Sequence, residues 1–76
     1  MREKQLKQLI ELGAISEIVA LYKEDLKGWV MVAISKESKD EITLSAARND
    51  VRVFKTLDAM KRLCDRQLNK HKLIVL

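Results

Sequence analysis

The chain of 76 residues contains little cysteine, histidine, glycine or aromatic residue, and no proline. Its single cysteine, Cys64, cannot form a disulfide within the chain. Cys64 and the single histidine, His71, are too few for a structural zinc site, which takes about four Cys or His ligands. The two glycines, Gly13 and Gly28, are too far apart for a glycine-rich phosphate loop. We therefore expect neither a metal site nor a cofactor.

The sequence also lacks a long apolar run. No run approaches the roughly 18 residues that cross a membrane, and the polar residues 1–5 do not resemble the apolar segment of a signal peptide. With the lone cysteine, this predicts a cytoplasmic protein without a membrane partner. The apolar content of 47% and charged content of 34% are those of a globular protein. Small domains of this kind usually gain from oligomerisation, so we expect one domain over residues 1–76 and a homodimer.

Groups that could carry catalysis are scarce. His71 lies between two lysines and is interpreted as a solvated loop histidine. Cys64 falls on the apolar stripe of a helix, which favours a buried hydrophobic residue over a nucleophile. The paired carboxylates Glu24-Asp25 and Asp40-Glu41 lie in polar turns, where solvation explains them. Because no nucleophile is paired with a base, the sequence predicts no enzyme, no catalytic residue and no small-molecule substrate.

The apolar pattern predicts an α+β domain. Helical spacing predicts one helix over residues 3–12, ended by Gly13, and a second over residues 57–68, with Thr56 as its N-cap. Residues 15–22 fit either a helix or a strand, and their β-branched content favours a strand. The expected strands are 15–22, 29–34, 41–47 and 73–76, with a short returning strand over 51–54 after a tight turn at Asn49-Asp50. The expected order is α-β-β-β-(β)-α-β, with a small antiparallel-type sheet and two helices on one face.

Positive charge is concentrated in the C-terminal half of the chain. Residues 42–76 carry eight Lys or Arg against three Asp, whereas residues 1–41 carry seven Lys or Arg against eight Asp or Glu. A concentrated basic field points first to a polyanion, and we expect a stripe along the last helix that contacts the phosphates of DNA. The alternative is an ordinary solvated helix face. The candidate nucleic-acid-binding residues are Arg48, Arg52, Lys55, Lys61, Arg62, Arg66, Lys70 and Lys72.

The stretch from Ile42 to Leu63 resembles the central motif of ParC-like, partition-associated small proteins of bacterial plasmids. In that pattern a strand ends in Leu-x-Thr/Ala-Ala-Arg, passes a tight turn and continues as Arg-x-Phe-x-x-Leu-Asp-Ala-Ala into a helix. The matching residues here are Leu44, Ala47, Arg48, Arg52, Phe54, Leu57, Asp58 and Ala59. The resemblance implies a plasmid or mobile-element accessory protein that acts in DNA partition, stability or transfer, and it implies no catalytic residues.

Two other functions are open at this point. A protein–protein adaptor without nucleic-acid affinity would bind its partner at a sheet edge by strand addition. The apolar strand 73–76 is such an edge unless it pairs, for example with the same strand of a second subunit. A double-stranded-RNA-binding fold shares the order α-β-β-β-α and reads duplex shape. That fold places lysines at the start of its last helix, where this chain has Thr56 to Ala59, including an acidic residue.

Overall fold

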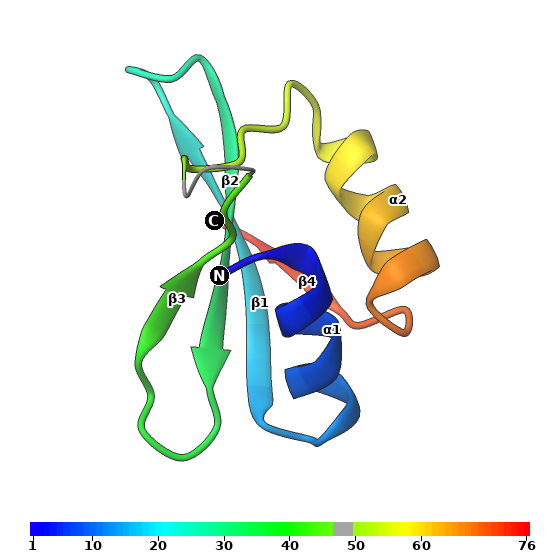
Figure 1. Cartoon of the computed structure of the whole chain (residues 1–76). Coiled ribbons are helices and arrows are strands. Elements are labelled where there is room, and N and C mark those ends of the chain that lie inside the picture. Colours follow the sequence, from blue (N-terminus) through cyan, green and yellow to red (C-terminus); the bar gives the residue numbers. More distant parts are fainter. Residues whose placement is uncertain (47–49) are drawn as a thin grey trace.

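The computed structural model describes residues 1–46 and 50–76, which form two helices and one sheet (Figure 1). The elements in chain order are α1 (Glu3–Glu11), β1 (Ile15–Lys23), β2 (Gly28–Ser35), β3 (Glu41–Thr43), α2 (Leu57–Gln67) and β4 (Leu73–Val75). The α+β class and the order of the elements are confirmed. In the described part of the chain, neither helix is long and apolar enough to cross a membrane.

Both helices begin or end at the residues that the local sequence indicated. Gly13 follows α1 with φ of +72°, the left-handed conformation that glycine adopts without strain. Its N–H donates to the Ile10 carbonyl at 3.0 Å, which satisfies a carbonyl at the end of the helix. At the start of α2, the Thr56 hydroxyl accepts a hydrogen bond from the Ala59 N–H at 3.2 Å. The predicted N-cap is therefore confirmed.

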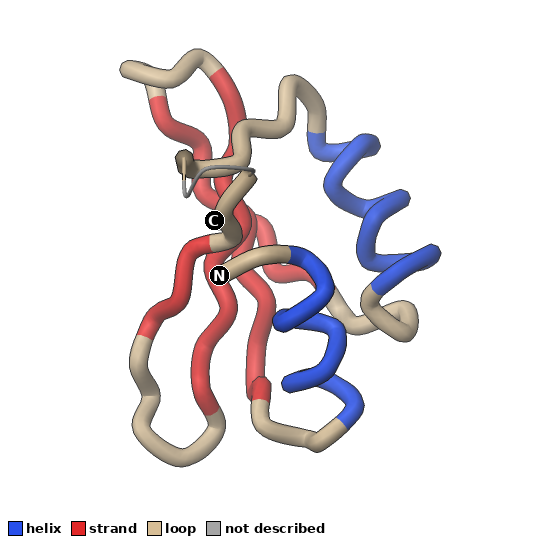
Figure 2. Tube along the Cα trace, viewed as in Figure 1, coloured by secondary structure: helices blue, strands red, loops and turns tan. Residues whose placement is uncertain are grey.

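The sheet is mixed, with the strand order β3-β2-β1-β4. β1 pairs antiparallel with β2, and β2 pairs antiparallel with β3, as two consecutive hairpins predict. β4 pairs in parallel with β1, with Leu73 opposite Ile18, which corrects the expected antiparallel-type sheet. The reason is the connection that precedes β4. Parallel strands are joined by a crossover connection. Here α2 crosses one face of the sheet after β3 and returns the chain beside β1 (Figure 2).

The segment between β3 and α2 departs from the predicted strands. β3 ends at Thr43, before the predicted end at residue 47, because the Ser45 N–H donates to the carbonyl of Met1 instead of a strand partner. Residues 51–54 form no strand, but Val51 makes an isolated antiparallel bridge to Ser45, so the chain does turn back after β3 as predicted. Phe54 makes an isolated bridge to Trp29, with N–H···O distances of 2.8 Å in both directions. Asn49 of the predicted tight turn lies outside the described residues.

The main core lies between the sheet and the two helices, which cover the same face (Figures 1 and 2). Six of its largest side chains are almost completely buried: Leu6, Ile18, Met31, Leu44, Met60 and Leu68. Each such side chain contributes about 1.5–3 kcal/mol by leaving water. Because the apolar stripes of α1 and α2 share this core, the polar faces of the two helices are exposed on the same side of the molecule.

Candidate nucleic-acid interface

The geometry of α2 divides the predicted basic stripe into two groups. Successive residues of a helix are rotated by about 100°, so Lys61 and Arg62 leave α2 on different sides. One group lines a shallow hollow of about 230 Å³ beside α1 and consists of Arg52, Arg62 and Arg66. The other group lines a hollow of about 470 Å³ beside β4 and consists of Lys61, Lys70 and Lys72.

Two further candidates belong to neither group. Lys55 is exposed and lies directly before the N-cap of α2, but it lines neither hollow. Arg48 lies outside the described residues. The structure therefore places three of the eight candidates together on the side of α2 that faces α1.

Arg52 is held in place by two contacts. Its guanidinium Nη1 lies 3.3 Å from Oε2 of Glu3, at the start of α1. Its Cζ also lies 4.9 Å from the centre of the Phe54 ring, a cation–π geometry. Both side chains of the ion pair are about one-third exposed, so solvent screens the attraction. Arg52 thus links α1 to the segment before α2, and Glu3 offsets much of its charge.

Helix α1 adds two lysines that are not among the eight predicted candidates. A second shallow hollow, of about 300 Å³, adjoins the first and is lined by Glu3, Lys4, Lys7 and Gln67. The two hollows share Glu3 and Gln67, so they form one continuous surface. We call it the α1–α2 basic surface, and its cations are Lys4, Lys7, Arg52, Arg62 and Arg66. Among the described residues that line it, Glu3 is the sole acidic side chain.

The lysines of α1 were missed because their half of the chain is nearly neutral overall. The net charge of residues 1–41 adds the lysines of α1 to the carboxylates of the polar turns, whereas the fold places these two groups in different parts of the molecule. A usable signal is present in the sequence. Lys4 and Lys7 stand three residues apart on one side of the first helix, next to the apolar stripe. If both helices cover the same sheet face, these lysines point toward the other helix.

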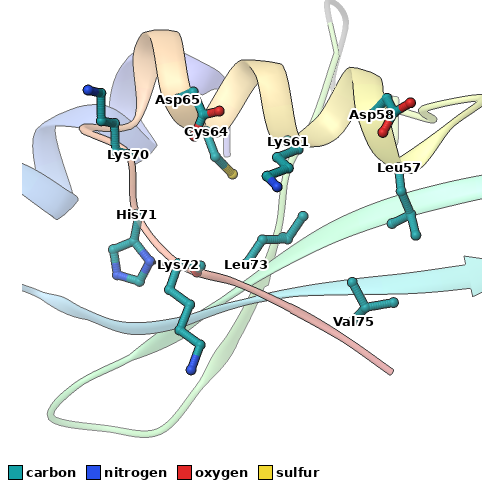
Figure 3. Close-up of a pocket in the computed structure, with 10 residues that line it drawn as sticks. All are labelled: Leu57, Asp58, Lys61, Cys64, Asp65, Lys70, His71, Lys72, Leu73 and Val75. Atoms are coloured by element: carbon teal, nitrogen blue, oxygen red, sulfur yellow. Dashed lines mark hydrogen bonds between the residues drawn. The ribbon is translucent and has the colours of Figure 1, made fainter.

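The hollow beside β4 has a different character, and we call it the α2–β4 groove (Figure 3). Apolar side chains of Leu57, Leu73 and Val75 line its length. Its three lysines are accompanied by two carboxylates, Asp58 and Asp65. An apolar groove with both signs of charge fits a protein surface better than a polyanion.

The thiol of Cys64 and the imidazole of His71 also line this groove. Cys64 is only 1% exposed, which confirms that it is a buried side chain. Burial, and secondarily the carboxylate of Asp65, raises the pKa of the Cys64 thiol to about 11, so the reactive thiolate is disfavoured at neutral pH. His71 donates from Nδ1 to the Lys72 carbonyl at 2.9 Å. In the described ranges, no three His, Cys, Asp or Glu side chains come together in a group suited to a metal ion.

No protein-family model, curated protein or solved structure shows a significant match to this chain. The resemblance to ParC-like proteins therefore stays a prediction. Of the residues that carry it, Phe54 is buried and Leu57 packs against the core. Asp58 is exposed in the first turn of α2, whereas Ala47 and Arg48 lie outside the described residues.

Proposed function

We propose that this protein binds the phosphate backbone of duplex DNA through the α1–α2 basic surface. It acts as a cytoplasmic, non-enzymatic accessory protein in the partition, stability or transfer of a plasmid or other mobile element. The biological setting of this proposal comes from the sequence resemblance alone. The proposed binding activity rests on one structural observation: in the described part of the chain, five cations from three segments converge on a surface with one carboxylate.

The arrangement of the cations supports contacts with phosphates rather than with bases. Lys4, Arg62 and Arg66 are exposed on the two helices and Lys7 is partly exposed, so these side chains can follow a phosphate backbone. A cation that contacts a phosphate releases condensed counterions, and each contact adds about −0.9 to the slope of log K against log salt concentration. Four such contacts predict a slope of about −4 and little preference for sequence.

The positions of the aromatic rings favour a duplex over a single strand. Proteins that bind single strands stack bases on exposed rings. Among residues 1–46 and 50–76, no aromatic side chain lines either hollow of the α1–α2 basic surface. Phe54 is buried beneath Arg52, and Trp29 packs edge-on against Tyr22 with ring centres 5.3 Å apart. The surface therefore offers charge but no stacking platform.

Duplex RNA is a second candidate, favoured by the order α1-β1-β2-β3-α2 and by the position of both helices on one sheet face. That arrangement is similar to the double-stranded-RNA-binding fold. The start of α2 weighs against it, because Asp58 is exposed there in place of the lysines of that fold. A DNA duplex and an RNA duplex of equal length and sequence therefore distinguish the two candidates.

The test is a fluorescence titration of a short DNA duplex, and of the matching RNA duplex, over a series of salt concentrations. The double substitution Arg62→Gln/Arg66→Gln removes two cations of the surface without placing a poor helix former in α2. We expect it to reduce the salt slope for DNA by about two. Its control is Lys36→Gln/Lys39→Gln, which makes the same change in net charge in the exposed turn between β2 and β3. A control that weakens binding as much as the arginine variant would show that only net charge matters.

A gain of affinity provides a sharper test than a loss. Glu3→Gln removes the carboxylate of the α1–α2 basic surface and releases Arg52 from its ion pair. We expect DNA binding to strengthen several-fold at low salt and the slope to steepen by about one. The matched control is Glu11→Gln, which removes an acidic charge from the other end of the same helix, outside both hollows. Equal effects of the two substitutions, or no binding of either duplex at low salt, would refute the proposed site.

A further inference from the structure

β4 is an edge strand, and its outer edge has no partner within the described chain. The sheet order places β1 on one side of β4 and nothing on the other. The Leu76 N–H donates to the Ala20 carbonyl of β1 at 3.2 Å. Because backbone groups alternate in direction along a strand, the N–H and C=O groups of Leu73 and Val75 point away from β1. An unpaired apolar edge of this kind is a template for another strand.

The side chains beside this edge are also incompletely covered. Val75 is 50% exposed and Leu76 is 76% exposed, although both are large apolar residues. Val75 lines the α2–β4 groove together with Leu57 and Leu73 (Figure 3). The open edge of the backbone and the open apolar groove therefore lie together, along one border of the molecule.

The charges of the groove are distributed unevenly, with a carboxylate at one end and two lysines with one carboxylate toward the other. Figure 3 shows Asp58 above Val75, at the end of β4, whereas Lys70 lies toward the end where β4 begins, together with Lys72 and Asp65. Lys61 lies between them and stands three and four residues from Asp58 and Asp65, which offset its charge. When two copies of the chain are related by a two-fold axis beside the middle of β4, the end of one groove lies next to the beginning of the other. Asp58 of one copy then lies toward Lys70 of the second copy.

We propose that β4 pairs antiparallel with β4 of a second copy of this chain, about a two-fold axis that lies between the two Ile74 residues. Leu73 then lies opposite Val75 of the second copy, and their outward N–H and C=O groups form hydrogen bonds in both directions. The two sheets become one continuous sheet. The two α2 helices lie side by side over the junction and close the α2–β4 groove, with Asp58 and Lys70 paired across it.

The dimer gives the α1–α2 basic surface a partner on the same side. A two-fold axis between antiparallel strands is perpendicular to the sheet, so the helix layers of both copies cover the same face. Each copy then presents its basic surface on that side, and a single duplex can contact both, which raises the apparent affinity. This consequence rests on the proposed DNA binding. The proposed dimer does not depend on DNA binding, because its formation is measured in the absence of nucleic acid.

The test is sedimentation velocity of the purified chain, from micromolar to near-millimolar concentration, with two proline variants. Val75→Pro removes an N–H that points outward from β4, a position at which an edge strand tolerates proline. We expect a wild-type dimer and a Val75→Pro monomer at all concentrations, with unchanged circular dichroism. The matched control is Thr43→Pro in β3, the opposite edge. The Leu44 N–H donates to Met31, so by alternation the Thr43 N–H also points outward, and this variant should stay dimeric.

Charge reversal provides a second test that does not perturb the backbone. Because of the two-fold symmetry, Asp58→Lys and Lys70→Asp each create two pairs of like charges across the proposed junction. Each substitution should weaken the dimer about tenfold. The double variant Asp58→Lys/Lys70→Asp restores opposite charges and should recover most of the wild-type affinity. Lys70 has φ of +56°, a conformation that Asp tolerates, so the reversal adds no backbone strain.

Three results would overturn the proposal. The first is a wild-type monomer at near-millimolar concentration. The second is a dimer that survives Val75→Pro but is lost in Thr43→Pro, which would place the interface at β3. The third is a double charge variant no better than the worse single variant. Loss of DNA binding with an intact dimer would refute only the proposed function.

Discussion

Gly28 is the position at which the fold leaves no space for a side chain. It begins β2, is buried, and pairs with Lys23 of β1. A Cβ added there would collide with Cγ1 of Val53 and would lie 2.9 Å from the carbonyl oxygen of Phe54. That oxygen accepts the hydrogen bond from the Trp29 N–H at 2.8 Å, so it cannot move away without breaking the bridge. We therefore expect Gly28→Ala to loosen the segment that leads into α2.

The magnitude follows from two opposing effects. Overpacking a close contact costs about 1–3 kcal/mol. Gly28 does not have a positive φ, so alanine can adopt its backbone conformation, and the less flexible unfolded chain returns about 0.4–1 kcal/mol. The net loss in the free energy of unfolding is therefore about 1–2 kcal/mol. For a domain of this size, that loss lowers Tm by about 5–15 °C.

Urea unfolding followed by Trp29 fluorescence measures this loss, and a double-mutant cycle assigns its cause. Val53 is 39% exposed, so Val53→Ala alone should cost little. Combined with Gly28→Ala, it removes one of the two collisions and should recover about 0.5–1 kcal/mol. Gly13→Ala is the contrasting control, since φ is +72° there and no atom lies within 4 Å of the added Cβ. The close packing of residues 51–54 against the start of β2 would be refuted if the Gly28→Ala protein were as stable as the wild type. It would also be refuted if the effects of Gly28→Ala and Val53→Ala on the free energy of unfolding were additive.

Two further predictions concern α2. Thr56→Ala removes the side-chain acceptor for the Ala59 N–H and should lower the free energy of unfolding by about 1 kcal/mol, while Thr56→Ser should be nearly neutral in the same urea experiment. Burial raises the pKa of Cys64 from 9.0 to about 11, so the contribution of its protonated thiol is complete below pH 9 and is lost as the pH rises through 11. Wild type should therefore lose up to about 2 kcal/mol more than Cys64→Val between these pH values, and parallel pH profiles of the two proteins would contradict the buried thiol.

The parts of the fold that were predictable are those set by neighbouring residues. Gly13 ends α1 because glycine adopts a positive φ, and Thr56 begins α2 because its hydroxyl replaces a missing backbone partner. The β-branched residues of β1 correctly favoured a strand. The direction of β4 was not predictable in this way. The direction of β4 depends on the position of α2 relative to β1. That position is set by contacts between segments that are distant in the sequence.

The candidate site was predictable only in part, for the same reason. Periodicity placed Arg62 and Arg66 on one exposed side of the last helix, and they do line one hollow. Lys61 belongs to the same predicted stripe, but it is rotated by one residue from Arg62 and therefore lies in the α2–β4 groove. The expected placement of both helices on one face of the sheet is correct. Which side of α1 faces α2 depends on contacts between distant segments, and this is why Lys4 and Lys7 were not expected to join the arginines.

The α1–α2 basic surface depends on contacts between the start of α1 and a segment some fifty residues later. The Ser45 N–H donates to the Met1 carbonyl, and Glu3 pairs with Arg52, so these two contacts orient the helix that carries Lys4 and Lys7. Of the two, the exposed ion pair contributes only about 0–1 kcal/mol. The backbone bond and the burial of Leu6 remain in Glu3→Gln. The substitution therefore changes the charge of the surface far more than its shape, which is why a gain in DNA affinity is the expected result.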